Sequence, residues 1–266
     1  MAHVEYYQAK SILSKASGFI NSYDYTLNPY GGCAFACAYC YAAFFAPNTA
    51  LQDTWGQWVQ VKENALDLLR KRRKRPLIDK TIYMSSVTDP YQPVEKRLEI
   101  TRALLYELLD YHQVRLVVQT RSPLVTRDID LLRQFPRARV HMTVTTDDDE
   151  VRKAFEPLCP SNTQRLWAAR TLADADIPTS ITLTPLLPVR DAAGFARALR
   201  DTRAQKFVVQ DFHPTTRRFA AGTGQQALTA AERWNWDSAR YEAVKALLRA
   251  ALPNFYEGKE GFAPAW

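Results

Sequence analysis

The sequence predicts an α/β protein built as a partial (β/α)6 TIM-type barrel with a C-terminal helical extension, and three observations support this. Runs rich in β-branched residues alternate with segments of helical period, which is typical of parallel strands joined by crossover helices. Six such units are too few to close an eight-stranded barrel. No linker-like tract divides the 266 residues. We therefore expect residues 1–211 to form the barrel and residues 212–266 to pack on it, as a single structural unit.

The predicted strands are short runs of β-branched and aromatic residues, and each is followed by a polar motif. In barrels of this kind the chemistry lies at the carboxyl ends of the strands. The motifs that follow the strands are therefore expected to meet on one face. The six strands are Phe19–Leu27, Thr81–Ser85, Val114–Thr120, Val140–Thr145, Thr179–Thr184 and Lys206–Gln210.

Helices are predicted between these strands and after them. From Val94 to Tyr111 apolar residues recur at helical spacing on one stripe, which indicates a helix that covers the barrel. A long C-terminal helix is expected to begin with Thr229 as its N-cap, to use Glu232 in a capping box, and to run to about Ala251. Shorter helices are expected at Asp128–Phe135, Asn162–Ala173 and Asp191–Arg200.

The composition favours a cytoplasmic protein without membrane contact. No segment offers the roughly 18 apolar residues of a membrane span, and no secretory signal pattern is present near the N-terminus. The net charge is +7. This charge is compatible with an acidic partner such as nucleic acid, although many enzymes without such a partner are equally basic.

Two sets of cations are candidates for nucleic-acid contact. Six adjacent cations at Arg70–Arg75 could neutralise phosphates, but they end the helix before the second strand. There they complement the helix C-terminus at the opposite end of the barrel, and we favour this interpretation. Loop cations at the barrel mouth are better placed, with tryptophans as stacking surfaces, although tryptophans more often pack in the core. These residues are Arg121, Arg127, Arg190, Arg217, Arg218, Trp234 and Trp236.

Three of the four cysteines follow the first strand at a C-x3-C-x2-C spacing: Cys33, Cys37 and Cys40. Three thiolates from one loop can hold three irons of a 4Fe–4S cluster and leave the fourth iron open. Gly31 and Gly32 would let the backbone approach such a cluster. The alternative is a zinc site that uses Cys159 as the fourth ligand. Structural zinc normally uses paired C-x2-C elements, however, and the second pair is missing.

With Tyr39 as the aromatic residue, the motif reads C-x3-C-x-aromatic-C, which resembles the cluster loop of radical S-adenosylmethionine enzymes. The motifs SSVTDPYQPVEKRLEITR, TRSPLVTRDIDLL, EPLCPSNTQRL and ITLTPLLP extend the resemblance to the spore photoproduct lyase-like branch, from about Thr26 to Pro188. The resemblance implies a 4Fe–4S cluster whose open iron is chelated by the amino and carboxylate groups of S-adenosylmethionine. It also implies reductive cleavage to a 5′-deoxyadenosyl radical, which abstracts a substrate hydrogen, and a reducing partner such as flavodoxin or ferredoxin.

The resemblance implies a cofactor role for five residues. Tyr39 would lie beside the adenine, Ser86 and Thr88 near the methionine end, Arg121 near the carboxylate and Thr143 near the ribose. Three of these positions have a structural alternative. Tyr39 could pack in the barrel mouth, Thr88 could form a turn before a helix, and Thr143 could make a core contact.

The sequence departs from the family at two positions. Spore photoproduct lyase returns a hydrogen from a cysteine at the position of Ser86, and a hydroxyl O–H is too strong for that step, so its reaction is not expected here. Arg121 replaces a more frequent lysine and can still clamp a carboxylate.

Cys159 could donate the hydrogen instead, or could be a small buried residue. His213 could contact substrate or transfer a proton, and Tyr91 could relay an electron, with a local hydrogen bond and packing as their alternatives.

The leading hypothesis is therefore a radical S-adenosylmethionine enzyme that abstracts hydrogen from an unidentified substrate, with a nucleobase in DNA or RNA as the favoured candidate. One alternative is the same machinery acting on a small metabolite or a peptide. A second alternative is a non-catalytic, zinc-stabilised nucleic-acid-binding protein.

Overall fold

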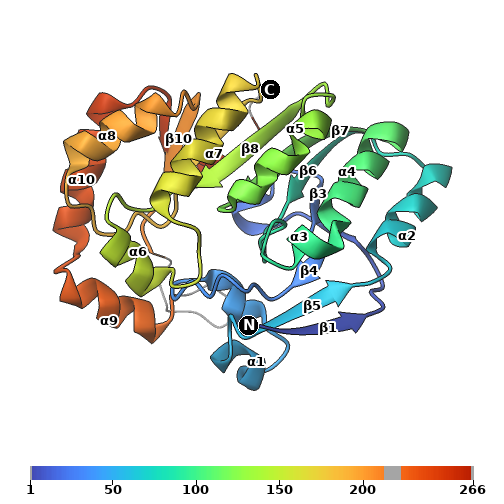
Figure 1. Cartoon of the computed structure of the whole chain (residues 1–266), viewed down its shortest axis with the longest axis horizontal. Coiled ribbons are helices and arrows are strands. Elements are labelled where there is room, and N and C mark those ends of the chain that lie inside the picture. The colour runs from blue at the N-terminus through green and yellow to red at the C-terminus, as the bar shows by residue number, and fades with distance from the viewer. Residues whose placement is uncertain (1, 213–222, 265–266) are drawn as a thin grey trace.

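The computed structural model describes residues 2–212 and 223–264, and its main feature is an eight-stranded, mostly parallel sheet covered by helices (Figure 1). The strand order is β11-β10-β9-β8-β7-β6-β3-β2, and β2 alone runs antiparallel to its neighbour. The six predicted strands are contiguous in this order, so the α/β prediction is confirmed. The strands are β2 Leu13–Lys15, β3 Tyr25–Leu27, β6 Ile78–Met84, β7 Gln113–Thr120, β8 Ala138–Thr143, β9 Thr179–Leu183, β10 Lys206–Val209 and β11 Phe255–Glu257.

The first predicted strand is shorter than expected. Only Tyr25–Leu27 pairs in the sheet as β3, whereas Gly18–Ile20 forms a turn of 3-10 helix, η1. Gly18 has a φ of +62°, a conformation that glycine adopts without strain and that strands exclude. The turn buries Ile20 against the core instead of extending the ladder.

A second, three-stranded sheet was not predicted, and it positions the cysteine segment. It has the order β1-β5-β4, with β1 at His3–Tyr7, β4 at Tyr30–Gly31 and β5 at Trp58–Lys62. Gly32 follows β4 with a φ of +65°, and a Cβ at this position would lie 2.6 Å from the Trp58 ring. Glycine is therefore required where the chain turns from this sheet into the cysteine segment.

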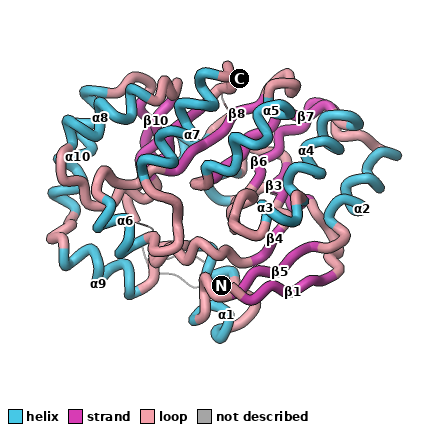
Figure 2. The backbone as a smooth tube through the Cα atoms, viewed as in Figure 1, coloured by secondary structure: helices cyan, strands magenta, loops and turns pink. Residues whose placement is uncertain are grey.

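The helix expected from Val94 to Tyr111 is interrupted. It consists of α3 (Glu95–Leu98) and α4 (Ile100–Tyr111), because Glu99 between them is left-handed with a φ of 51°. Figure 2 shows the helices on the outside of the strands. The other elements of the first 212 residues are η2 Tyr41–Phe45, α1 Thr49–Asp53, α2 Ala65–Arg70, η3 Lys71–Lys74, η4 Pro123–Asp128, α5 Ile129–Leu132, α6 Asp149–Phe155, α7 Asn162–Asp174 and α8 Ala192–Asp201.

The single long C-terminal helix was a wrong prediction. Two helices occur instead, α9 at Gln225–Arg233 and α10 at Ser238–Ala251, and Thr229 lies inside α9 instead of capping it. The chain breaks at Asn235, whose φ of 48° ends α9, and Asp237 then caps α10 by accepting from a backbone N–H of its first turn. After α10, β11 joins the main sheet beside β10, and α11 (Gly258–Phe262) follows.

The basic run at Arg70–Arg75 ends the helix that precedes β6, as predicted. Arg73, within this run, also makes specific contacts with another helix. Arg73 donates to both carboxylate oxygens of Glu107, at 2.7 and 2.6 Å, and its guanidinium lies 3.4 Å from the centroid of the Tyr111 ring. This part of the run therefore joins α2 and η3 to α4.

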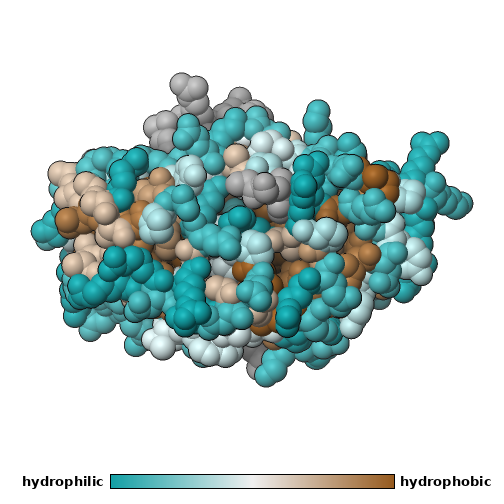
Figure 3. Space-filling view, turned by 90° about the horizontal axis from the view of Figure 1, so that it is seen from above, coloured by the Kyte–Doolittle hydropathy of each residue, from teal (hydrophilic) through white to brown (hydrophobic). Residues whose placement is uncertain are grey.

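The apolar core lies between the main sheet and its helices, and the surface seen from above is mostly hydrophilic (Figure 3). Leu104 of α4 and Leu116 of β7 are both fully buried in this core. In the described part of the chain, no helix combines the length and apolar character that a bilayer crossing requires.

We predict that Leu104→Ala lowers the free energy of unfolding by about 2–5 kcal/mol, because it leaves a cavity in the close-packed core. Leu247→Ala is the matched control, since Leu247 lies on α10 and is 59% exposed. It should change the free energy by less than about 0.5 kcal/mol. Urea denaturation followed by circular dichroism measures both, and equal losses would contradict the assignment of this core.

Candidate active site

The three clustered cysteines lie on an irregular segment between β4 and η2, where the chain folds back on itself. Ala36 is left-handed with a φ of 52°, and the N–H of Cys40 donates to the carbonyl of Cys37 at 3.1 Å. All three thiols are free, with Cys33 and Cys37 buried and Cys40 half-buried. The reversal at Ala36 therefore places three unpaired thiols in one tight loop, which we call the cysteine loop (Cys33–Cys40).

The segment after β6 anchors the backbone at the start of the cysteine loop. The hydroxyl of Thr88 donates to the carbonyl of Gly32 at 2.6 Å. The side chain of Gln92 accepts from the N–H of Ala34 at 2.9 Å and donates to the Thr88 hydroxyl at 3.2 Å. Thr88 thus lies at the predicted site, and its hydroxyl is engaged with the loop backbone.

Ser86 is held beside the cysteine loop by polar contacts from two other segments. The Asn28 side chain accepts from the Ser86 N–H at 2.9 Å and donates to the Ser86 hydroxyl at 3.3 Å. The Tyr41 hydroxyl donates to the Ser86 carbonyl. Ser86 is half-buried, so the structure brings it to the rim of the site with its hydroxyl partly exposed.

Arg121, after β7, contacts the cysteine loop directly. Its Nη1 donates to the Tyr39 hydroxyl oxygen at 2.7 Å and to the Cys37 sulfur at 3.0 Å. Its backbone N–H is fixed by the carboxylate of Asp89, at 2.9 Å. Asp89 is itself buried and also accepts from the Thr120 hydroxyl at 2.7 Å. Two predicted residues, Arg121 and Tyr39, therefore meet at one of the predicted metal ligands.

Glu156 and Arg165 complete this contact, and sequence reasoning assigned neither of them a role. The Glu156 carboxylate is fully buried, accepts from the Tyr39 hydroxyl, and pairs with Arg121 at 2.9 Å and with Arg165 at 2.5 Å. Burial raises the pKa of Glu156, but the charges of Arg165 and Arg121 outweigh burial and lower the pKa to about 2. Both residues belong to the EPLCPSNTQRL motif, which was therefore the feature of the sequence from which a role for them could have been inferred.

The electrostatics of the thiols fit a shared positive group. Burial, followed by the charges of Asp89, Cys37 and Cys40, raises the pKa of Cys33 well above its usual value. Burial and then the charge of Cys37 raise the pKa of Cys40 to about 12. The pKa of Cys37 is lowered, first by a hydrogen bond from the Cys159 thiol and then by Arg121. Neighbouring thiolates oppose one another's ionisation, and a cationic metal group held between them would remove this opposition.

The spacing of the donors distinguishes two kinds of metal group. Among the described residues, no three His, Cys, Asp or Glu side chains gather closely enough around one point to hold a single ion. One zinc ion draws all of its ligands to one point, whereas a 4Fe–4S cluster takes each cysteine on a separate iron. The C-x3-C-x2-C spacing on one loop, without a second C-x2-C pair, is the sequence feature that favours a cluster over structural zinc.

Cys159 lies behind the cysteine loop. Its sulfur lies 3.5 Å from the sulfur of Cys37 and 3.5 Å from the carbonyl oxygen of Phe35. Together with Phe35, Tyr91 and Ser122, it lines a cleft of about 480 Å³. The structure thus brings Cys159 and Tyr91 to one cleft, and their proposed hydrogen-donor and electron-relay roles stay predictions.

The remaining predicted residues lie at some distance from the cysteine loop or outside the described residues. Thr143, at the end of β8, is buried, and its hydroxyl lies 2.9 Å from that of Thr182 in a polar layer within the sheet. Arg127 is engaged with the buried carboxylates of Glu95 and Asp128, at 2.7 and 2.8 Å, so it is not free for phosphates. Predicted residues outside the described part are His213, Arg217 and Arg218.

We predict that Glu156→Ala lowers the free energy of unfolding by about 3–5 kcal/mol, because it leaves Arg165 and Arg121 as buried, uncompensated charges. Glu150→Ala is the control, since Glu150 lies on α6 with a side chain that is 79% exposed. It should cost less than about 0.5 kcal/mol. Urea titration monitored by fluorescence gives both values, and a Glu156→Ala protein as stable as the control would contradict a structural role for this carboxylate.

Solved structures with a similar fold come from two kinds of protein. Spore photoproduct lyase complexed with dinucleoside spore photoproduct aligns over 96% of this chain and 81% of its own, with a TM-score of 0.64 and 15% identity. Streptococcus suis SuiB bound to precursor peptide SuiA aligns over 87% of this chain and 48% of its own, with a TM-score of 0.55 and 13% identity. At these identities the likeness shows a shared fold, which agrees with a partial TIM-type barrel.

Sequence relatives match a shorter part of the chain. The uncharacterized protein MJ0683 of Methanocaldococcus jannaschii is 38% identical over 164 residues, which are 62% of this chain and 61% of the relative. The uncharacterized protein Rv2578c of Mycobacterium tuberculosis is 29% identical over 177 residues, which are 62% of this chain and 50% of the relative. The chain thus spans between half and about three fifths of these relatives.

The model of the Radical SAM superfamily matches residues 27–201, well over half of the chain, and the chain belongs to this superfamily.

Proposed function

We propose that this chain is a radical S-adenosylmethionine enzyme that holds a 4Fe–4S cluster on Cys33, Cys37 and Cys40 and abstracts a hydrogen from a nucleobase in DNA or RNA. When bound, the cluster supplies the electron that cleaves S-adenosylmethionine and so generates the radical that removes the hydrogen. The observation that carries the proposal is the set of three free thiols on one loop, in a chain whose residues 27–201 match the Radical SAM superfamily.

In this proposal the chain's own residues position the cofactor. Arg121 presents a guanidinium beside Cys37, and the contacts described for it use Nη1, so its remaining N–H groups are available to a carboxylate. Tyr39 is buried next to the Phe212 ring, at 6.4 Å between centroids, with its hydroxyl fixed by Glu156, which suits a flat wall for adenine. Ser86 offers a partly exposed hydroxyl toward the methionine end.

Two further residues are proposed to act on the cofactor site through the protein. Thr88 fixes the carbonyl of Gly32 and so sets the path of the cysteine loop. Arg165, the partner of Glu156, lies 3.5 Å from the carbonyl of Thr143 through its Nη1, which connects the end of β8 to the charged cluster. We propose that Thr143 itself lies near the ribose.

Net charge and fold both support the proposed substrate class. The net charge is +7, and the spore photoproduct lyase that shares this fold over 96% of the chain is complexed with a dinucleoside. A second structure of that enzyme has bound AdoMet. The alternative substrate is a peptide, because SuiB shares the fold over 87% of the chain and its structure contains a precursor peptide. Ser86 stands where the lyase has its hydrogen-donating cysteine, so we do not propose the lyase reaction.

Metal content tests the cluster. Wild-type protein purified without oxygen should be brown and contain about four irons per chain. Cys37→Ala should lose most of this iron and the colour, whereas Cys159→Ala should keep both, because Cys159 is not a proposed ligand although its sulfur is only 3.5 Å from that of Cys37.

The same pair of variants tests the zinc alternative. A colourless protein with one zinc per chain, which both Cys37→Ala and Cys159→Ala lose, would overturn the proposal in favour of a four-cysteine zinc site.

Isotope transfer tests the reaction and its substrate. Reduced enzyme is incubated with S-adenosylmethionine and a single-stranded oligonucleotide deuterated on its bases, and 5′-deoxyadenosine is analysed by mass spectrometry. Deuterium in this product is expected, because the radical removes hydrogen from the base. Deuterium from a labelled peptide but not from the oligonucleotide would support the alternative substrate class.

A further inference from the structure

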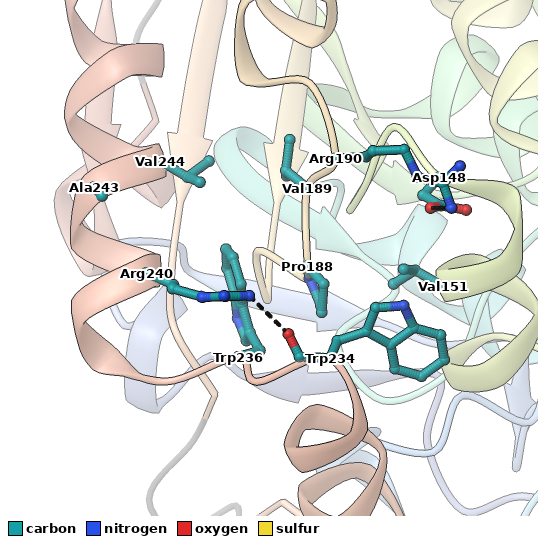
Figure 4. Close-up of a pocket in the computed structure, with 10 residues that line it drawn as sticks. All are labelled: Asp148, Val151, Pro188, Val189, Arg190, Trp234, Trp236, Arg240, Ala243 and Val244. Atoms are coloured by element: carbon teal, nitrogen blue, oxygen red, sulfur yellow. Dashed lines mark hydrogen bonds and ion pairs between the residues drawn. The ribbon is translucent and has the colours of Figure 1, made fainter.

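A second cleft, with a volume of about 330 Å³, lies beside the cysteine loop and is lined by aromatic and charged side chains (Figure 4). Its walls come from the start of α6, the segment after β9 and the turn between α9 and α10. This volume is near the lower end of the range for small-ligand pockets. The residues used below are Val151, Pro188, Trp234, Trp236 and Arg240, and we call the site the tryptophan cleft.

The turn between α9 and α10 presents two indole rings in fixed positions. Asn235 has a left-handed backbone conformation. The backbone N–H groups of Trp234 and Trp236 both donate to the carbonyl of Ala231, at 3.1 and 2.9 Å. Both tryptophans are half-buried, and Figure 4 shows their rings on either side of Pro188. Rigid aromatic faces that are partly open to solvent are suitable stacking platforms for bases.

Arg240 is a cation that the helix itself does not require. It lies in the first turn of α10, where a positive charge is opposed by the helix dipole. Among the described residues no carboxylate pairs with it, and its Nη1 donates to the carbonyl of Trp234 at 3.1 Å. Figure 4 shows the side chain extending along Trp236 into the cleft. By contrast, Arg190 on the rim is paired with Asp148 at 2.6 Å.

The tryptophan cleft is adjacent to the cysteine loop and separate from it. The ring of Trp234 packs on Phe155, with 5.9 Å between centroids, and the carbonyl of Phe155 accepts from the N–H of Ala38 at 2.8 Å. Ala38 lies between Cys37 and Cys40 in the chain. The cleft is therefore connected to the cysteine loop through Phe155.

We propose that the tryptophan cleft binds an unpaired nucleobase next to the reacting nucleotide, with the base stacked on the indole rings and its phosphate at Arg240. This inference deepens the proposed function and rests on its nucleic-acid substrate. The enzyme then requires single-stranded or locally opened nucleic acid, because a base that stacks on protein has left its duplex. The pairing of an aromatic platform with a free cation favours a nucleotide over an apolar peptide side chain.

The test is binding of the cluster-loaded full chain to a fluorescent single-stranded oligonucleotide of about ten nucleotides, followed by anisotropy. Trp236→Leu keeps an apolar side chain but removes the stacking surface, and should weaken binding roughly tenfold to a hundredfold. Arg240→Gln should weaken binding and lower the salt slope by about 0.7, the value for one phosphate contact on a single strand. Arg249→Gln is the matched control, because Arg249 lies at the opposite end of α10 and pairs with Glu257, and its binding should be unchanged.

An abasic site distinguishes stacking from a structural effect of the variants. Moving one abasic position along the oligonucleotide should find a place where wild-type binding weakens more than Trp236→Leu binding, since the variant keeps only Trp234 as a stacking surface. If wild-type protein binds the oligonucleotide and both cleft variants behave like Arg249→Gln, the cleft inference fails and the nucleic-acid substrate stands. If wild-type protein binds no oligonucleotide, or a peptide displaces it at equal concentration, both the cleft inference and the nucleic-acid substrate fail.

Discussion

The enclosed carboxylate of Glu156 is the interaction on which the architecture of the site depends. It pairs with Arg165 of α7 and with Arg121 after β7, and the Tyr39 hydroxyl donates to it. Such a charge is tolerated inside a protein only while its partners are present, so each partner fixes the others. Side chains, and not strand pairing, therefore attach the cysteine loop to the carboxyl ends of the sheet.

Hydrogen bonds from neighbouring segments also hold the backbone of the cysteine loop and determine its shape. Thr88 and Gln92 bind its first residues, and Phe155 binds Ala38 in its middle, all through hydrogen bonds to backbone groups. A loop held in this way can keep three thiols close together although their negative charges oppose one another. These contacts fix the backbone of the loop through segments that follow β6 and end α6.

Sequence reasoning predicted the main sheet, and failed where distant residues decide the structure. The six parallel strands have strong local signals, so they were found with only their ends displaced. The small sheet was missed because β4 is only two residues long, its partner β5 is remote in sequence, and β5 pairs in turn with the equally remote β1. The break at Asn235 was missed because Thr229 and Glu232 match a capping box locally. Glu156 and Arg165 were visible as charges, but their pairing is a property of the fold.

The position of β11 has a consequence for how the chain can be shortened. This strand covers the outer edge of β10, and Gly261 of α11 packs so closely on Val208 that a Cβ would lie 2.2 Å from it. Removing the chain from Phe255 onward would leave the backbone of β10, a buried apolar strand, without its partner at this edge, which invites edge-to-edge aggregation. β11 and α11 thus protect this edge of the sheet, and a shortened chain should keep the residues up to Phe262.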